Sequence, residues 1–179
     1  MFLSLLDAEG EVAQVAETVA QKAQAIGYEG FAVAMIGVAL CVLLCGIGSA
    51  IGLFKTGTAA AGVLGEAPNK FGKVLVLVLL PATQGIYGFI IGIIASGSLS
   101  LDMTLTQGWA MLGAVMPMAI AGLVTGIFQG KSAVNCIYAV GKQDSLGGKL
   151  IIYPAMIEFY AILGLIVSIM VVPLVGVAA

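Results

Sequence analysis

Three long stretches of this chain carry no charged side chain, and a fourth carries only one. The uncharged stretches run from Gly30 to Phe54, from Val74 to Leu101 and from Met103 to Gly130, and the fourth follows Lys149. A helix needs about 20 apolar residues to cross a bilayer core about 30 Å thick. Hydrophobic residues make up 61% of the 179 and charged residues only 9%, which excludes an ordinary soluble domain. The sequence therefore predicts an all-α membrane protein with four transmembrane helices.

The lysines mark two of the three connections between these helices. Six of them flank the first and third connections, namely Lys55, Lys70, Lys73, Lys131, Lys142 and Lys149. By the positive-inside rule these connections are cytoplasmic, which predicts a multi-pass protein of the cell membrane with both termini extracytoplasmic. Because the net charge is -2 and most of the chain is apolar, we expect the protein to lie in a lipid bilayer and not to bind nucleic acid. The chain has no Arg and no His, so a mechanism that needs a guanidinium must take it from another chain.

The chain repeats itself at an offset of 76 residues, the separation of Lys55 from Lys131. At this offset Gly46 lies on Gly122 and Gly88 on Gly164, but Ala82 lies where the second repeat has Glu158. Each repeat contains two crossings, so the two share one orientation in the membrane. We expect a duplicated helical hairpin, with residues 29–102 as the first hairpin and residues 103–179 as the second.

The first 28 residues differ from the rest because they are acidic and rich in alanine. Their apolar residues recur at helical spacing, at Val12, Val15, Ala16, Val19, Ala23 and Ile26. This pattern predicts an N-terminal amphipathic leader, residues 1–28, outside the membrane or on its surface.

Glycines recur along one face of the first and third predicted helices. The third has Gly122, Gly126 and Gly130 at four-residue spacing, and the first has Gly46, Gly48 and Gly52. Small residues at such spacing let two helix backbones approach closely. The pattern predicts that these two helices are the crowded ones, as an inner ring of helices would require.

Glu158 is the single carboxylate of the fourth stretch. It follows Lys149 by nine residues, which is roughly 13 Å at about 1.5 Å per residue and places it near the bilayer midplane. A charge there costs about 2.5 to 3.5 kcal/mol, so an acid at this depth is by default a functional residue. The sequence thus points to Glu158 as the centre of an ion pathway.

Few other strongly polar groups lie within the spans. Thr83, Gln84 and Tyr87 follow Pro81 on neighbouring ridges of the second helix, and Gln129 lies in the third. Pro81 lacks an N–H and leaves a carbonyl free in the turn before it. A carboxylate, a hydroxyl, two amide oxygens and a free carbonyl make an oxygen cage that replaces the hydration shell of a hard cation. This set favours Na⁺ over H⁺, because a proton site needs little besides the acid; buried amides that only join helices are the other interpretation. The Tyr87 hydroxyl is a candidate donor to Glu158.

Four segments carry a resemblance to a known family. They are GIGSAIG from Gly46, FGKVLVLVLLPATQGIYGF from Phe71, GLVTGIFQGK from Gly122 and MIEFYAILG from Met156. From Gly30 onward the chain is similar to the proteolipid (c or K) subunits of V-type rotary ATPases, and within them to the Na⁺-translocating bacterial kind.

This resemblance implies a rotor ring of identical four-helix subunits turning against a membrane stator subunit that supplies an Arg. ATP hydrolysis would belong to a separate soluble head, so this subunit would be non-catalytic. Its cytoplasmic loops, near Leu64 to Asn69 and Val140 to Gly147, would contact the central stalk. The resemblance also implies a ligand set for Na⁺: the Leu80 carbonyl, Thr83, Gln84, Gln129 and Glu158, with Tyr87 hydrogen-bonded to Glu158.

Three other functions are compatible with parts of the pattern. An H⁺-translocating ring also needs Glu158, and it differs from a Na⁺-translocating ring in that its transport does not depend on Na⁺. A small proton-coupled multidrug antiporter also uses a membrane acid, but it requires a roomy aromatic pocket, and the residues around Glu158 are mostly aliphatic. A passive pore accounts for the glycines and leaves the polar set unexplained.

Overall fold

The computed structural model describes residues 2–177, with every side chain from Tyr28 to Val175. Within that range all regular elements are helical, in the order α1 (Phe2–Glu66), α2 (Phe71–Leu79), α3 (Thr83–Ser96), α4 (Leu105–Lys142) and α5 (Ile152–Val177), with short 3-10 turns η1 (Pro68–Lys70), η2 (Leu80–Ala82) and η3 (Asp144–Leu146). Four helical segments are long and apolar enough to cross a membrane: Tyr28–Glu66, Pro68–Ser96, Leu105–Lys142 and Ile152–Val175. The predicted all-α class with four spans is confirmed.

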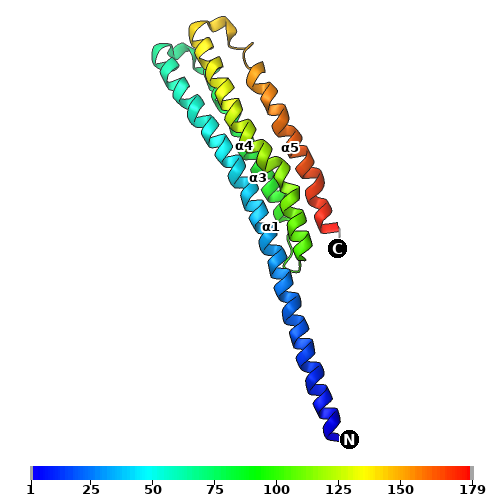
Figure 1. Ribbon diagram of the computed structural model, residues 1–179. Helices are drawn as coiled ribbons and strands as arrows, with labels where there is room; N and C mark the ends of the chain where they lie inside the picture. The colour runs from blue at the N-terminus through cyan, green and yellow to red at the C-terminus, as the bar shows by residue number, and fades with distance from the viewer. Residues whose placement is uncertain (1, 178–179) are drawn as a thin grey trace.

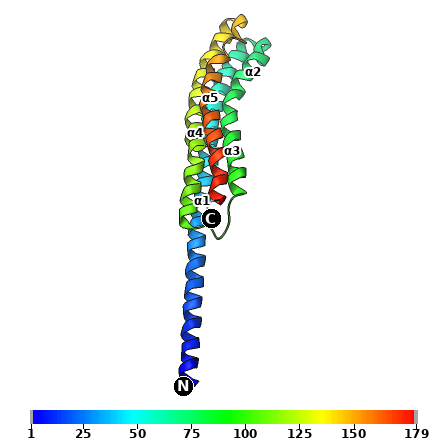
Figure 2. The same ribbon diagram turned by 90° about the vertical axis from the view of Figure 1, so that its right-hand side faces the viewer.

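The helices run roughly parallel in one elongated bundle (Figures 1 and 2). The two lysine-flanked connections lie together at one end, and the 97–104 connection and the end of α5 lie at the other. Helix α1 continues past that second end as a single rod. The predicted leader is therefore helical and continuous with the first span, while its predicted apolar face falls on side chains outside those described.

Helices α1 and α4 continue beyond the lysines at which the uncharged stretches end. Helix α1 runs past Lys55 to Glu66, and α4 runs past Lys131 to Lys142. Each lysine marks the end of an apolar stretch, but a helix continues for as long as its residues favour helical backbone. The segment after Lys55 contains three consecutive alanines, Ala59–Ala61, and alanine has the highest helix propensity. Both helices therefore project from the apolar zone at the lysine-rich end.

The second span is built from α2, η2 and α3, and the interruption is at Pro81. Because Pro81 has no N–H to donate, the turn tightens to a 3-10 conformation at Leu80–Ala82. The Thr56 hydroxyl of α1 lies 3.1 Å from the Val78 carbonyl oxygen in the turn before, and 3.1 Å from the Leu53 carbonyl of its own helix. A hydroxyl has a single hydrogen, so Thr56 can donate to the Val78 carbonyl or to a carbonyl of its own helix, one at a time.

Glycines bring the backbones of α1 and α4 into direct contact. A Cβ built on Gly52 would lie 2.5 Å from the Gly126 carbonyl oxygen, and one on Gly48 would lie 2.6 Å from that of Gly122. No side chain larger than hydrogen fits between such backbones. The predicted crowding of the first and third spans is therefore realised inside a single chain.

The two repeats pack in the same way internally. A Cβ on Gly88 of α3 would meet the Cys45 side chain of α1, and a Cβ on Gly164 of α5 would meet the Ala121 side chain of α4. Both residues of the second contact follow those of the first by 76 positions. The duplication read from the sequence is thus a duplication of the hairpin structure.

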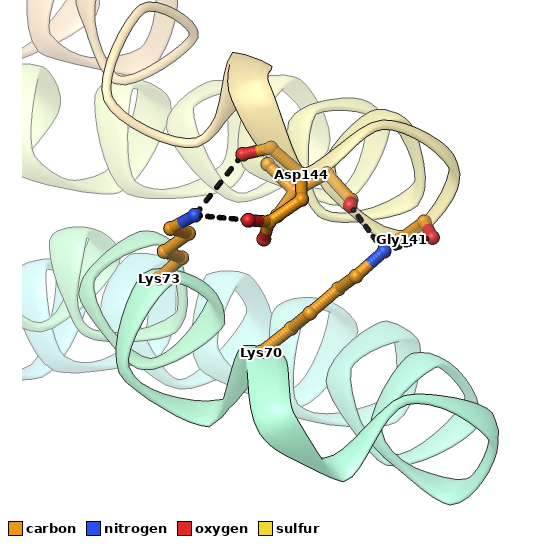
Figure 3. Close-up of polar contacts among 5 residues, drawn as sticks. Lys70, Lys73, Gly141 and Asp144 are labelled. Atoms are coloured by element: carbon orange, nitrogen blue, oxygen red, sulfur yellow. Dashed lines mark hydrogen bonds and ion pairs between the residues drawn. The ribbon is translucent and has the colours of Figure 1, made fainter.

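The two lysine-flanked connections are fastened to each other. The Lys73 ammonium pairs with the Asp144 carboxylate at 2.6 Å, and Lys70 donates to the carbonyls of Val140 and Gly141 at 3.2 and 2.6 Å (Figure 3). Lys70 therefore caps carbonyls at the C-terminal end of α4, where a cation is favoured by the helix dipole. Both hairpins end in one joined surface.

Two apolar clusters fill the bundle, one toward each end. The cluster near the lysine-rich end contains Leu77 and Ile137, and the other contains Met111 and Met118. Along α4 the buried Gln129 lies between the two clusters. A polar layer therefore crosses the middle of an otherwise apolar bundle.

Candidate cation-binding site

Glu158 of α5 lies at the centre of this polar layer and accepts hydrogen bonds from three side chains. Its Oε2 atom lies 3.0 Å from Thr83 Oγ1, 3.1 Å from Gln84 Nε2 and 2.7 Å from Gln129 Nε2. Thr83 and Gln84 belong to α3 and Gln129 to α4. Four residues chosen from the sequence thus converge on one point, where three separate helices meet.

The two glutamine amides use all of their hydrogens. Gln84 Nε2 donates to Gln129 Oε1 at 2.6 Å as well as to Glu158, and Gln129 Nε2 donates to the Pro154 carbonyl at 3.1 Å as well as to Glu158. A carboxamide has two N–H hydrogens, so neither amide can donate further. Both glutamines are completely buried, and their orientations are fixed by this network.

Thr83 links the carboxylate to the interruption at Pro81. Its Oγ1 atom lies 2.9 Å from the Leu80 carbonyl oxygen and 3.0 Å from Glu158. A hydroxyl has a single hydrogen, so it donates to one of these oxygens at a time. The Leu80 carbonyl, a predicted ligand, therefore lies beside the site, at the 3-10 turn that Pro81 imposes.

The site has more oxygen acceptors than donors. Gln84 Oε1 and Glu158 Oε1 are both buried and have no hydrogen-bond partner. The only ion pair in the described part of the chain is the distant Lys73–Asp144 pair, so no lysine neutralises Glu158 there. Buried unpaired oxygens beside an uncompensated carboxylate are costly unless a proton or a cation satisfies them. The donor set thus fits a hard cation, whose preferred ligands are oxygens.

A thiolate or imidazole metal site is not formed. No group of three or more His, Cys, Asp or Glu side chains gathers anywhere among the described residues. The three cysteines are buried, and Cys45 donates to the Met118 carbonyl at 3.3 Å. These thiols act as packing residues of the bundle.

Tyr87 lies close to both Glu158 and Thr83. It stands outside the three hydrogen bonds that hold the carboxylate in the described structure. Its predicted donation to Glu158 therefore stays a prediction.

Pro154, which the sequence places one turn before Glu158, supplies the carbonyl that orients Gln129. Two hydroxyls that sequence reasoning had not assigned to the site also support it, and one of them, Thr56, lies within hydrogen-bond distance of the carbonyl in the turn before Pro81. Ser168 of α5 accepts from the Met118 N–H, one residue after the proline inside α4, Pro117. For Ser168 the signal available was a lone hydroxyl in an apolar run, which in a membrane needs a partner.

The fold and the site together define a multi-pass membrane protein built from two equivalent hairpins with one carboxylate between them. The family model that describes the C subunit of ATP synthase matches the chain twice, over residues 36–95 and 112–171. The chain belongs to this family of ATP synthase C subunits. The two matches begin and end 76 residues apart, which reproduces the offset of the internal repeat.

Several curated proteins are similar over most of this chain. The V-type sodium ATPase subunit K of Enterococcus hirae is 44% identical over 143 residues, which cover 80% of this chain and 92% of that protein. The A-type ATP synthase subunit K of Methanocaldococcus jannaschii is 40% identical over 135 residues, covering 75% and 59%. The human 16 kDa proteolipid of the V-type proton ATPase is 25% identical over 135 residues, covering 75% and 87%.

Proposed function

We propose that this chain is the non-catalytic rotor-ring subunit of a V-type ATPase and that it carries Na⁺ across the membrane, bound at Glu158. One observation carries the proposal: two buried oxygens, Gln84 Oε1 and Glu158 Oε1, lack partners beside glutamine amides whose hydrogens are all in use. The similarity to a protein named V-type sodium ATPase subunit K supports the same choice of ion.

Na⁺ suits this site better than H⁺ for a chemical reason. A proton on Glu158 adds a single O–H donor, which can pair with only one other oxygen, such as Gln84 Oε1. A cation can be shared by Glu158, Gln84, the Thr83 hydroxyl and the Leu80 carbonyl, and Gln129 completes the proposed ligand set. Na⁺ binding therefore uses the acceptors that a proton leaves idle.

Binding also makes the carboxylate compatible with a membrane. Glu158 is only half-buried in the chain, so part of it faces whatever surrounds the subunit. A bound monovalent cation neutralises the carboxylate and lowers the cost of turning it past lipid. An Arg would then displace the ion at the stator. This Arg would belong to the stator subunit, because this chain has none.

The remaining partners follow from the two ends of the bundle. The lysines support a cytoplasmic position for the surface formed by the 64–69 and 140–147 segments. A central stalk, driven by ATP hydrolysis in a separate head, would dock there. The termini would then be extracytoplasmic, with residues 1–28 as a helical leader.

The two hairpins, residues 29–102 and 103–179, would contribute one ion together. Since Ala82 stands where Glu158 has its counterpart, a ring of such subunits carries half as many ions as it has hairpins. Fewer ions per ATP allow a steeper gradient, which suits a pump.

The experiment is carbodiimide labelling of the detergent-solubilised oligomer across pH, with NaCl or KCl added. Carbodiimide modifies the protonated acid, so an ion that occupies the site protects Glu158. We expect protection by Na⁺ and none by K⁺, with Na⁺ extending protection to lower pH because it competes with the proton. The Glu158→Gln variant, which has nothing to label at this position, identifies the modified residue.

Two results would overturn the proposal. Labelling that ignores Na⁺ and falls only as pH rises would mean an H⁺ ring, with the glutamines joining helices. ATP-driven transport that persists in Glu158→Gln would remove this residue from the ion pathway altogether.

A further inference from the structure

A pocket of about 430 Å³ lies between α1 and α4, on the lysine-rich side of the closest contact between these helices. At that contact a Cβ built on Gly130 would lie 3.0 Å from the Gly52 carbonyl oxygen. Lys55 follows Gly52 by three residues and Lys131 follows Gly130 by one, and both lysines line the pocket. The two lysines are also repeat equivalents, 76 positions apart. The duplication thus brings two ammonium groups to a single pocket.

The polar side chains of this pocket are donors, and none of them is acidic. They are Lys55, Thr58, Lys131, Asn135 and Tyr138. The Thr58 hydroxyl spends its hydrogen within its own helix, on a carbonyl at 2.8 Å. Two ammonium groups, one amide N–H₂ and one phenol hydroxyl remain as donors. The one ion pair among the described residues lies in the connections, so neither lysine of the pocket is paired with an acid there.

No carboxylate follows closely along either helix to balance these two charges. On α1 the next acid after Lys55 is Glu66, eleven residues later and roughly 16 Å away at about 1.5 Å per residue. On α4 no acid follows Lys131 before the helix ends. The Lys131 Nζ atom lies 5.3 Å from the centroid of the Phe128 ring, a contact that attracts the ammonium group and leaves its charge in place. The pocket therefore carries two positive charges that need an anion.

We propose that this pocket binds a phosphate group between the ammonium groups of Lys55 and Lys131. A phosphate offers oxygen acceptors, which match a set of side chains that donate, and lysine binds phosphate as a point charge. Asn135 and Tyr138 would supply two further hydrogen bonds. The site is separate from the carboxylate site, because it shares no residue with the proposed Na⁺ ligand set.

The apolar side of the pocket favours a phosphate that is carried by a lipid. Ile51 and Ile127 each precede one of the two lysines by one helical turn, on the same helix face. Ile51 is 37% exposed, and Phe54 in the pocket wall is 75% exposed. Both lysines stand where an uncharged stretch ends, and basic pockets between membrane helices on the cytoplasmic side bind anionic headgroups. An acyl chain would lie along Ile51 while its phosphate meets the lysines.

The opposite side of the pocket suits a polar headgroup. A second pocket, of about 380 Å³, shares Tyr138 with the first and is lined by Glu66 and Lys142. A carboxylate and an ammonium group there offer an acceptor and a donor to hydroxyl groups. Along α1 and α4 the surface thus passes from apolar to cationic and then to mixed charge. Phosphatidylglycerol has the same order, from acyl chain to phosphate to glycerol.

Native mass spectrometry of the delipidated, detergent-solubilised oligomer tests the site, with dioleoyl phosphatidylglycerol as the probe. We expect Lys55→Gln and Lys131→Gln each to raise the apparent dissociation constant about fivefold, and the double variant to raise it roughly thirtyfold. The double Lys→Arg variant at the same positions should bind within a few-fold of the unsubstituted chain, because Arg also binds phosphate. Lys149→Gln is the matched control, since it removes one exposed charge at the same end of the bundle and should leave binding unchanged.

Sodium phosphate then distinguishes the two sources of the group. Displacement of the lipid by millimolar phosphate would show that the site accepts free phosphate, and retention of the lipid would show that the phosphate must be carried by a lipid. Binding of neither probe would overturn the site, as would an equal loss in Lys149→Gln. It would also be overturned if the two single Gln variants bound the lipid as tightly as the unsubstituted chain. Carbodiimide protection of Glu158 by Na⁺ should not change in these variants, so it reports on the proposed function separately.

Discussion

The side chains of Gln84 and Gln129 are joined by a 2.6 Å hydrogen bond across two helices of different hairpins. Gln84 donates this bond and has one amide hydrogen left, whereas Gln129 accepts it through Oε1 and keeps both of its own. Each amide donates one hydrogen to Glu158 Oε2, and Gln129 donates its other hydrogen to the Pro154 carbonyl. The carboxylate is therefore held by donors whose own positions depend on each other, so the network is expected to fail as a unit.

Replacing Gln129 with Leu should weaken Na⁺ binding strongly. Leu is the residue that the first repeat has at the equivalent position, Leu53, so the change is compatible with the helix. It removes donors to Glu158 and Pro154, and hydrogen bonds to charged groups contribute about 1.5–3 kcal/mol. Half-protection against carbodiimide should then need roughly ten to a hundred times more NaCl. The exposed Gln143→Leu change should leave the midpoint in place, and an unshifted midpoint in Gln129→Leu would contradict the ligand set.

Thr56→Val should destabilise the subunit, because it leaves the Val78 carbonyl without its partner from α1. The expected loss is about 1 kcal/mol, read as a lower thermal midpoint of the solubilised protein. Thr58→Val is the matched control, since the exposed Thr58 hydroxyl bonds only to Phe54 of its own helix. Equal midpoints for the two variants would mean that Thr56 does not secure the interruption at Pro81.

A methyl group at Gly52 should separate α1 from α4. Its Cβ would lie 2.5 Å from the Gly126 carbonyl oxygen and 2.6 Å from Pro81 Cβ, where backbone cannot yield cheaply. Overpacking of this kind costs about 1–3 kcal/mol. Gly57→Ala, five residues along the same helix with open space around it, should be neutral or slightly stabilising. Thermal midpoints of the two variants measure the difference, and similar values would argue against tight packing at Gly52.

The Lys73–Asp144 ion pair, which joins the two lysine-flanked connections, should be lost in acid. The hydrogen bond from Lys73 holds the pKa of Asp144 below its ordinary value. A carboxyl whose pKa is lowered by folding stabilises the fold above its unfolded pKa and ceases to do so as pH falls through its folded pKa. Proteolysis of the 143–151 segment by an acid-active protease should therefore accelerate as pH drops through that range. Asp144→Asn should cleave at the fast rate throughout, and an unchanged pH profile in this variant would refute the assignment.

The site could be predicted from the sequence further than the helix boundaries could. Glu158, Gln84 and Gln129 stand out because a polar side chain in an apolar span is expensive and therefore informative. The ends of α1 and α4 did not follow from charge, because Lys55 and Lys131 mark where the uncharged stretches end and not where helical hydrogen bonding ends. The sequence also showed glycines on two helices without showing that Gly52 and Gly130 face each other in the same chain.

The hydrogen-bond partners between helices were the feature of the structure that the sequence predicted least. Nothing in the spacing of Pro154 and Gln129 indicates that a carbonyl of one orients the amide of the other, since this depends on the rotation of α5 against α4. The Thr56 contact with Val78 likewise depends on how α1 packs beside the 3-10 turn. These hydrogen-bond partners depend on how the helices pack in three dimensions, and the residue types in the sequence do not determine that packing.

The oxygens of the site are split between the two repeats, Thr83 and Gln84 in one and Gln129 and Glu158 in the other. An unfused hairpin of either kind could therefore complete a site only beside a hairpin of the other kind. Joining the two in one polypeptide fixes their proportion at one to one, whatever the rate at which the gene is expressed. The number of ions carried for each pair of hairpins would then be set by the covalent chain and would not depend on the supply of subunits.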